Sequence, residues 1–144
     1  MSTEIGWAEV AELLRDAPPA HLATATGEGE PHVSTVMPGV DGDVVWMVTW
    51  RRSGKAVNLI ENPQVALMWS ANDAETYVWG TAELVEDEAV RRRLWSGGVL
   101  PYDPEGFFGS VDGADSVVVR ITPTRALAKV GGESGPRTLR WQAG

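Results

Sequence analysis

The sequence predicts a mainly β protein with about seven strands and few, short helices. Three observations indicate this fold class. Short runs of alternating or β-branched residues recur along the chain, clusters of Gly, Pro, Asn and Asp separate most of them, and the helical patterns are short. Because consecutive strands are joined by short turns, we expect mostly antiparallel order and a small closed barrel rather than a doubly wound sheet.

Each predicted element has a local signal. Ser2 or Thr3 can cap a first helix that ends near Asp16, before two prolines. Gly80 within a long strand indicates a bulge or a close backbone approach. We expect strands at residues 21–26, 32–37, 44–49, 64–69, 75–85, 116–121 and 125–130, with a turn at Pro123, and helices at residues 56–61 and 87–95.

Two segments are expected to be irregular. Residues 96–115 form a long loop that carries Tyr102, Phe107 and Phe108, and such a loop is usually functional or packed on a partner. The glycine-rich residues 131–144 are expected to form a flexible or partner-contacting tail. At 144 residues the whole chain, 1–144, is predicted to be a single domain.

Composition excludes several classes of function. A net charge of -8 argues against nucleic-acid binding. The absence of cysteine excludes thiol nucleophiles and cysteine-ligated metals, and His21 and His32 have no metal-site spacing, so we predict no metal. No leader or membrane-length apolar run is visible, so a cytoplasmic protein without membrane contact is expected. No catalytic side chain can be assigned, because hydrolase and nucleotide-binding motifs are absent.

The sharpest chemical signal is the basic elbow, residues 50–55 (WRRSGK), which joins a predicted strand to a short helix. The start of a helix offers unpaired N–H groups and a positive dipole end, so Ser53, Gly54 and Lys55 can form a phosphate seat. The alternative is that Ser53 only caps the helix and the cations are solvated. A chain with two lysines and a charge of -8 favours the anion seat.

Other basic and aromatic residues admit simpler interpretations. Arg91, Arg92 and Arg93 are predicted to form a solvated helix face, because no anion-binding turn accompanies them. The tryptophans are assigned by position: Trp50 is the best candidate to cover a bound ring, whereas a core or dimer-interface position is predicted for Trp46, Trp69 and Trp79.

The pattern around the elbow resembles the FMN-binding split β-barrel of the pyridoxamine 5'-phosphate oxidase-like superfamily. The matching features are Thr49, Ser53 and Lys55 followed by a short helix, Asn62-Pro63 and a strand. Residues 21–26, 29–32 and 77–84 resemble further parts of that fold. Leu94-Trp95, followed by PYDP at residues 101–104, is similar to the general stress protein branch.

The resemblance implies a split barrel of about six to seven mostly antiparallel strands and a homodimer with two FMN sites at its interface. Thr49, Ser53 and Lys55 would hold the phosphate, and the backbone of residues 34–36 and 48 would contact the isoalloxazine edge. The partner chain would contribute residues near Trp95 and from 129–137. The expected cofactor-binding residues are Ser34, Thr35, Val36, Val48, Thr49, Trp50, Arg52, Ser53, Gly54, Lys55, Thr76, Trp95, Lys129 and Arg137.

Departures from the family pattern narrow the expected activity. Gly54 stands where many relatives have arginine, so Arg51 or Arg52 would have to replace that charge. Ser34 and Lys129 occupy positions of arginine and tryptophan in true pyridoxamine phosphate oxidases, so that activity is not expected.

Four functions are therefore considered. The first is an FMN-dependent oxidoreductase acting on an unknown small substrate, and the second is a reductase that uses a deazaflavin coenzyme. The third is a non-catalytic stress protein that binds flavin or haem. The fourth is a structural dimer without a cofactor.

Overall fold

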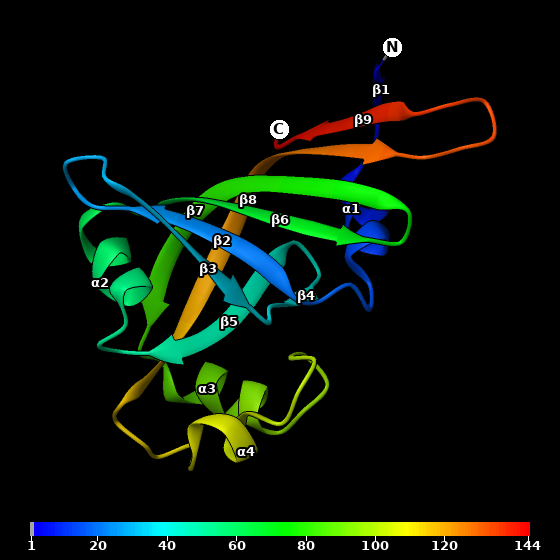
Figure 1. The fold of residues 1–144 in the computed structure, drawn as a ribbon. Helices are drawn as coiled ribbons and strands as arrows, with labels where there is room; N and C mark the ends of the chain where they lie inside the picture. The colour runs from blue at the N-terminus through cyan, green and yellow to red at the C-terminus, as the bar shows by residue number, and fades with distance from the viewer. Residues whose placement is uncertain (1) are drawn as a thin grey trace.

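One nine-stranded sheet forms most of the computed structural model, which describes residues 2–144 (Figure 1). The mainly β prediction is confirmed, and short strands add to the number expected. In chain order the elements are β1 (Ser2–Glu4), α1 (Trp7–Leu14), β2 (Ala20–Ala25), β3 (Pro31–Val36), β4 (Gly39–Asp41), β5 (Val44–Trp50), α2 (Gly54–Glu61), β6 (Gln64–Ala71), β7 (Ala74–Val85), α3 (Glu88–Trp95), α4 (Pro104–Phe108), β8 (Ser116–Val130) and β9 (Arg137–Gln142).

The sheet is curved but not closed. Its strand order is β1-β9-β8-β7-β6-β2-β3, and β5 pairs with β4 and with β8. The expectation of a closed barrel was wrong, because within residues 2–144 no ladder joins β3 to the second half of β5. β5 pairs with β4 on one edge and with β8 on the other, and not with β3. Among the described residues, one edge of β3 and one edge of residues 47–50 therefore have no strand partner.

Strand β8 changes partner along one of its edges. Residues 116–121 pair with β5 and residues 125–130 pair with β9, while the other edge follows β7 along its length. Two separate strands with a turn at Pro123 were predicted, but the chain continues as one strand. The bulge prediction at Gly80 is confirmed: the register shifts between Trp79 and Gly80, and a Cβ on Gly80 would lie 2.4 Å from the Thr122 carbonyl oxygen.

Both ends of the chain differ from expectation. Residues 2–4 form β1, which pairs in parallel with β9, so the first helix begins only at Trp7. Glu9 Oε1 accepts the Gly6 N–H at 3.2 Å, and Ser2 and Thr3 are not caps. Residues 137–142 form β9 and are therefore built into the sheet rather than free. Contact of this tail with a partner stays a prediction.

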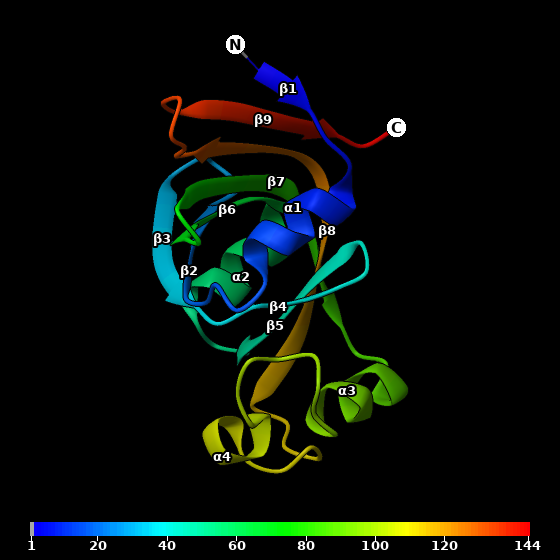
Figure 2. The same cartoon turned by 90° about the vertical axis from the view of Figure 1, so that its right-hand side faces the viewer.

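The long loop is partly ordered by a short helix and by close packing. α4 begins with Pro104, and the Asp103 side chain accepts the Glu105 N–H at 3.0 Å. A Cβ on Gly39 would lie 2.0 Å from the Val99 carbonyl oxygen, so glycine allows the loop to pack directly on β4. Two views show α3 and α4 at one end of the molecule and β1 and β9 at the other (Figures 1 and 2).

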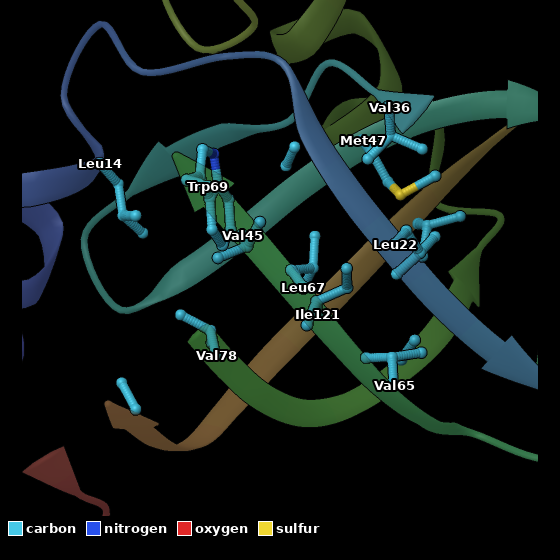
Figure 3. Packing of buried hydrophobic residues seen from close by; sticks show 14 of the residues in the cluster. Leu14, Leu22, Val36, Val45, Met47, Val65, Leu67, Trp69, Val78 and Ile121 are labelled. Atoms are coloured by element: carbon cyan, nitrogen blue, oxygen red, sulfur yellow. The ribbon is translucent and has the colours of Figure 1, made fainter. Parts of the chain in front are cut away.

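The larger core fills the inside of the curved sheet. Figure 3 shows Leu22, Val36, Met47 and Ile121 converging from β2, β3, β5 and β8, and these side chains are buried. A second core lies between β5, β8 and α3, with buried Leu94 at its centre. The alternating pattern of the strands therefore places β5 between two apolar layers.

Candidate functional site

A cavity of about 440 Å³ lies where the sheet is split between β3 and β5. This volume is within the range of small-molecule sites. The end of β3 provides one wall and residues 48–50 of β5 provide another, so the unpaired edges of two strands flank the cavity. Its lining is Thr35, Val36, Met37, Val48, Thr49, Trp50, Lys55, Tyr102, Phe107 and Phe108.

The polar end of the cavity is formed where β5 passes into α2. Thr49 is buried, and its Oγ1 lies 3.2 Å from Ser53 Oγ. Ser53 Oγ also accepts the Ala56 N–H at 3.3 Å and so caps α2, which was the alternative interpretation of this serine. Lys55, in the first turn of α2, lines the same cavity. Two hydroxyls, a lysine and the first N–H groups of a helix therefore occupy one corner.

Ser34 supplies a polar atom without a partner. It pairs with Leu22 across β2 and β3, so its side chain shares the face that carries the buried Leu22. Ser34 Oγ is the single buried side-chain nitrogen or oxygen within residues 2–144 that lacks a hydrogen bond. A buried hydroxyl without a partner is costly, and this one lies one residue before Thr35, which lines the cavity.

The cations of the elbow have different environments. Arg51 donates to Glu86 at 2.7 Å and to the Ala114 carbonyl oxygen at 3.1 Å. The hydrogen bond with Glu86 raises the pKa of Arg51 and lowers the pKa of Glu86. Arg52 is exposed, and neither it nor Lys55 takes part in any of the six ion pairs found within residues 2–144. Lys55 and Arg52, rather than Arg51, remain available for an anion.

Aromatic side chains form a second part of the cavity wall. Trp50 packs edge-on against Phe108 with ring centroids 4.9 Å apart, and Phe107 is the same distance from Phe108. Tyr102 lies beside both phenylalanines, and burial raises its pKa to about 12. The phenol therefore stays neutral at physiological pH, and this wall carries no charge.

Most of the predicted cofactor residues come together at this place, and some do not. Thr35, Val36, Val48, Thr49, Trp50 and Lys55 line the cavity, while Arg52, Ser53 and Gly54 complete the elbow beside it. Ser34 precedes Thr35 in β3 and is not part of the lining. Four other predicted residues are further along the fold: Thr76 is buried between Trp69 and Ala128, Trp95 donates to the Gly109 carbonyl oxygen, Lys129 lines a separate hollow with Pro136, and Arg137 begins β9.

Five residues at the site are absent from the predicted set of cofactor-binding residues. Tyr102, Phe107 and Phe108 line the cavity from the loop that was expected to be functional or packed on a partner, and Met37 lines it directly after β3. His32 lies beside the start of α2, since a Cβ on Gly54 would be 3.7 Å from His32 Nε2. The period-2 alternation of β3 could have indicated this, because His32, Ser34 and Val36 share one face of the strand.

Two further observations concern the described residues. None of the four helices within residues 2–144 is long and apolar enough to cross a bilayer. Over the same range, no three or more His, Asp or Glu side chains are grouped to hold a metal ion.

Comparison with known proteins identifies the same architecture. Residues 7–129 match the family model described as pyridoxamine 5'-phosphate oxidase. A pyridoxamine 5'-phosphate oxidase-related, FMN-binding protein from Nostoc punctiforme has a TM-score of 0.75 at 18% identity, with 95% of this chain and 90% of that chain covered. General Stress Protein 26 from Bacillus anthracis has a TM-score of 0.70 at 18% identity, covering 84% and 91%.

A third structural relative has higher sequence identity. An F420 reductase is 26% identical, with a TM-score of 0.59 and coverage of 80% of this chain and 93% of that chain. The search of curated proteins gives no match.

Proposed function

Because the chain belongs to the pyridoxamine 5'-phosphate oxidase family, we propose that it is a flavoprotein oxidoreductase that binds FMN in the split between β3 and β5 and acts on a small acceptor. The observation that carries this proposal is the continuity of the cavity: Thr49 and Lys55 line the same 440 Å³ space as the apolar and aromatic walls. An anionic group and a flat ring can therefore be bound together.

The polar corner binds the phosphate. Lys55 provides a charge-assisted hydrogen bond, and the start of α2 provides N–H groups and the positive end of the helix dipole. Thr49 and Ser53 hold their hydroxyls 3.2 Å apart, so both are oriented before the ligand arrives. The orphaned Ser34 hydroxyl gains a partner from the ligand.

The apolar part of the cavity orients the ring and excludes water. Val36 and Val48 are buried on facing walls, and Trp50 and Phe108 close one side with edge-on contact. The free edges of β3 and β5 present backbone N–H and C=O groups to the polar rim of a flavin. When bound, FMN supplies hydride or electron transfer, while this chain positions the ring and shields it.

The outer face of the sheet supports a homodimer. One row of paired residues crosses four strands as Val33, Ala23, Ala66 and Trp79, and Val33 is 67% exposed. Such an apolar row on a sheet face suits a second copy of this chain. Lys129 and Arg137 are remote from the elbow of their own chain, so only a partner would bring them to the site (Figure 1).

The homodimer is tested by light scattering on the purified protein. Ala66→Glu places a charge in the apolar row and should give a monomer, while Ala8→Glu on the exposed face of α1 should leave the dimer intact. A wild-type protein that is monomeric at micromolar concentration contradicts the homodimer.

The cofactor is tested by an absorbance spectrum of protein purified without added flavin, followed by mass analysis of the molecule that denaturation releases. A flavin spectrum with FMN released, or tight FMN binding on titration, is the expected result. A haem spectrum, or a colourless protein that does not bind FMN, contradicts the proposal. Turnover with reduced nicotinamide and an added acceptor separates an oxidoreductase from a non-catalytic flavin carrier.

A second candidate is a reductase that uses a deazaflavin coenzyme. The F420 reductase is the relative with the highest identity among those described above. Arg52 is exposed next to the phosphate corner, where it can contact a longer anionic tail. Parallel titrations with FMN and with the deazaflavin coenzyme distinguish the candidates, and a clear preference for FMN excludes the second. Pyridoxamine phosphate oxidation is not proposed, because Ser34 provides no cation.

A further inference from the structure

His32 lies beside the polar corner of the cavity, although it comes from β3 and not from β5 or α2. It pairs with Thr24 across the β2–β3 hairpin. Thr24 is buried, and its Oγ1 accepts a hydrogen bond from Asn58 of α2 at 3.1 Å. This bond ties the hairpin to the helix. His32 is consequently held over the first turn of α2, where its Nε2 faces Gly54.

Glycine at position 54 is not required by the backbone. Its φ is not in the left-handed region, in contrast to six other glycines within residues 2–144. A Cβ there would meet only the imidazole of His32, at 3.7 Å from Nε2 and 4.0 Å from Cε1, which are ordinary contact distances. The missing side chain leaves open space between the imidazole and the N–H groups that begin α2.

The charges around His32 come from the elements packed against it. Thr24 on β2 and Ser34 on its own strand are neutral. Carboxylates lie at the distant end of α2 and in the hairpin turn, and Glu61 is bonded to the Gly27 N–H at 3.2 Å. The charged groups on the surrounding elements are Arg52 and Lys55 on the helix side and Glu28, Glu30 and Glu61 on the hairpin side and at the end of α2.

We propose that His32 is a third cationic contact for the phosphate of the cofactor, together with Lys55 and Arg52, so that cofactor affinity depends on the protonation of His32. The proposal rests on the proposed function. An imidazole changes charge between pH 5 and 8, and its cation donates to phosphate oxygens as a charge-assisted bond. At pH 6, FMN should therefore bind more tightly to the wild-type protein than to a variant that lacks His32. This difference in affinity should disappear at pH 8.

The test compares the dissociation constants of FMN and riboflavin for wild type and His32→Gln at pH 6 and pH 8, measured by quenching of flavin fluorescence. The phosphate also titrates near pH 6, so the informative quantity is the ratio of the two proteins' constants at one pH. We expect His32→Gln to weaken FMN binding about tenfold at pH 6 and less than about twofold at pH 8. Riboflavin, which lacks the phosphate, should show a ratio near one at both pH values.

A second variant keeps the test informative if His32→Gln perturbs the hairpin. Adding Gly54→Arg to His32→Gln places a permanent cation in the open space and should restore FMN affinity at both pH values. Equal ratios at pH 6 and pH 8, or an equal effect on riboflavin, overturn the role of His32 while leaving FMN binding in place. Failure of the wild-type protein to bind FMN overturns the proposed function, and this inference with it.

Discussion

The chain has two clusters of cations that look alike in sequence and differ in the structure. The basic elbow contains Arg51, Arg52 and Lys55, and α3 contains Arg91, Arg92 and Arg93. In α3 each arginine has a partner: Arg92 pairs with Glu88 at 2.8 Å, and Arg93 pairs with Asp41 at 2.7 Å. In the elbow only Arg51 is paired within residues 2–144.

Arg91 is the clearest case of a cation used for structure. Its guanidinium donates to the carbonyl oxygens of Val111, Gly113 and Ser116 and to Ser116 Oγ, and it lies 4.3 Å from the Trp95 ring centroid. Partial burial lowers its pKa from the ordinary value. The prediction of a solvated face was therefore wrong for Arg91, which fastens the loop before β8 to α3.

The comparison teaches that local composition does not separate a structural cation from a binding one. The difference lies in partners about twenty to fifty residues away, such as Val111 for Arg91 and Asp41 for Arg93. Cations without such partners beside a cavity are the ones that a ligand can use.

The largest effect is expected from Arg91→Ala. It leaves three carbonyl oxygens and the Ser116 hydroxyl without their donor, so the free energy of unfolding should fall by about 2–3 kcal/mol. Urea denaturation measures this change. Arg92→Ala is the control, since its ion pairs are exposed and should contribute much less to the free energy of unfolding. Equal losses of unfolding free energy in both variants would contradict the structural role of Arg91.

Lys55→Ala should weaken FMN binding but leave the folding stability almost unchanged. The stability of the cofactor-free protein should change by less than about 0.5 kcal/mol, because Lys55 has no ion pair within residues 2–144. FMN affinity should fall about tenfold or more, since a charge-assisted bond contributes about 1.5–3 kcal/mol. Arg15→Ala, at the C-cap of α1, removes the same charge far from the elbow and is the control for FMN affinity. Unchanged FMN affinity in Lys55→Ala would remove the phosphate corner from the proposal.

Two serines extend the comparison to neutral groups. Ser34→Ala removes a buried hydroxyl without a partner, so the cofactor-free protein should gain up to about 1 kcal/mol while FMN affinity falls several-fold. Ser116→Ala removes an acceptor of Arg91 and should lose about 1 kcal/mol. Urea denaturation and FMN titration measure both. If Ser34→Ala lost stability, its hydroxyl would have a structural role.

The smallest effect concerns the Arg51–Glu86 pair. Hydrogen bonding to Arg51 holds the pKa of Glu86 below its ordinary value of 4.5. The ion pair therefore stabilises the folded protein above pH 4.5, and this contribution is lost as the pH falls through the lowered pKa of Glu86. The pair is exposed, so its contribution should be less than about 1 kcal/mol. The difference in stability between wild type and Glu86→Gln, measured from pH 7 to pH 3, should shrink with acid. A difference in stability that does not change with pH would contradict a stabilising role of ionised Glu86.

The sequence predicted the local geometry of the elbow, while the cofactor role of its residues stays a prediction. Thr49, Ser53 and Lys55 are close along the chain, so their meeting depends only on a strand that turns into a capped helix. Gly80 was informative for a similar reason, because a glycine inside a strand indicates a close approach.

Features that depend on distant pairing were missed. β1 pairs with β9 across nearly the whole chain, for example Thr3 with Leu139, and three exposed residues carry no signal of it. The approach of His32 to Gly54 and the isolation of Ser34 depend on how the β2–β3 hairpin lies against α2. The positions of Lys129 and Arg137 relative to a cofactor depend on a second chain.

Because β8 changes partner along its length, the two ends of the molecule can unfold locally without each other. Among residues 2–144, the ladder partners of β9 are β1 and residues 125–130 of β8, and its Trp141 also packs on Trp7 of α1. Residues 116–121 of β8 instead pair with β5, which forms one wall of the cavity. Fraying of β9 therefore removes no ladder that supports the cavity. Backbone amides of β9 should exchange with deuterium well before those of residues 117–119, while the strands that wall the cavity keep their ladders.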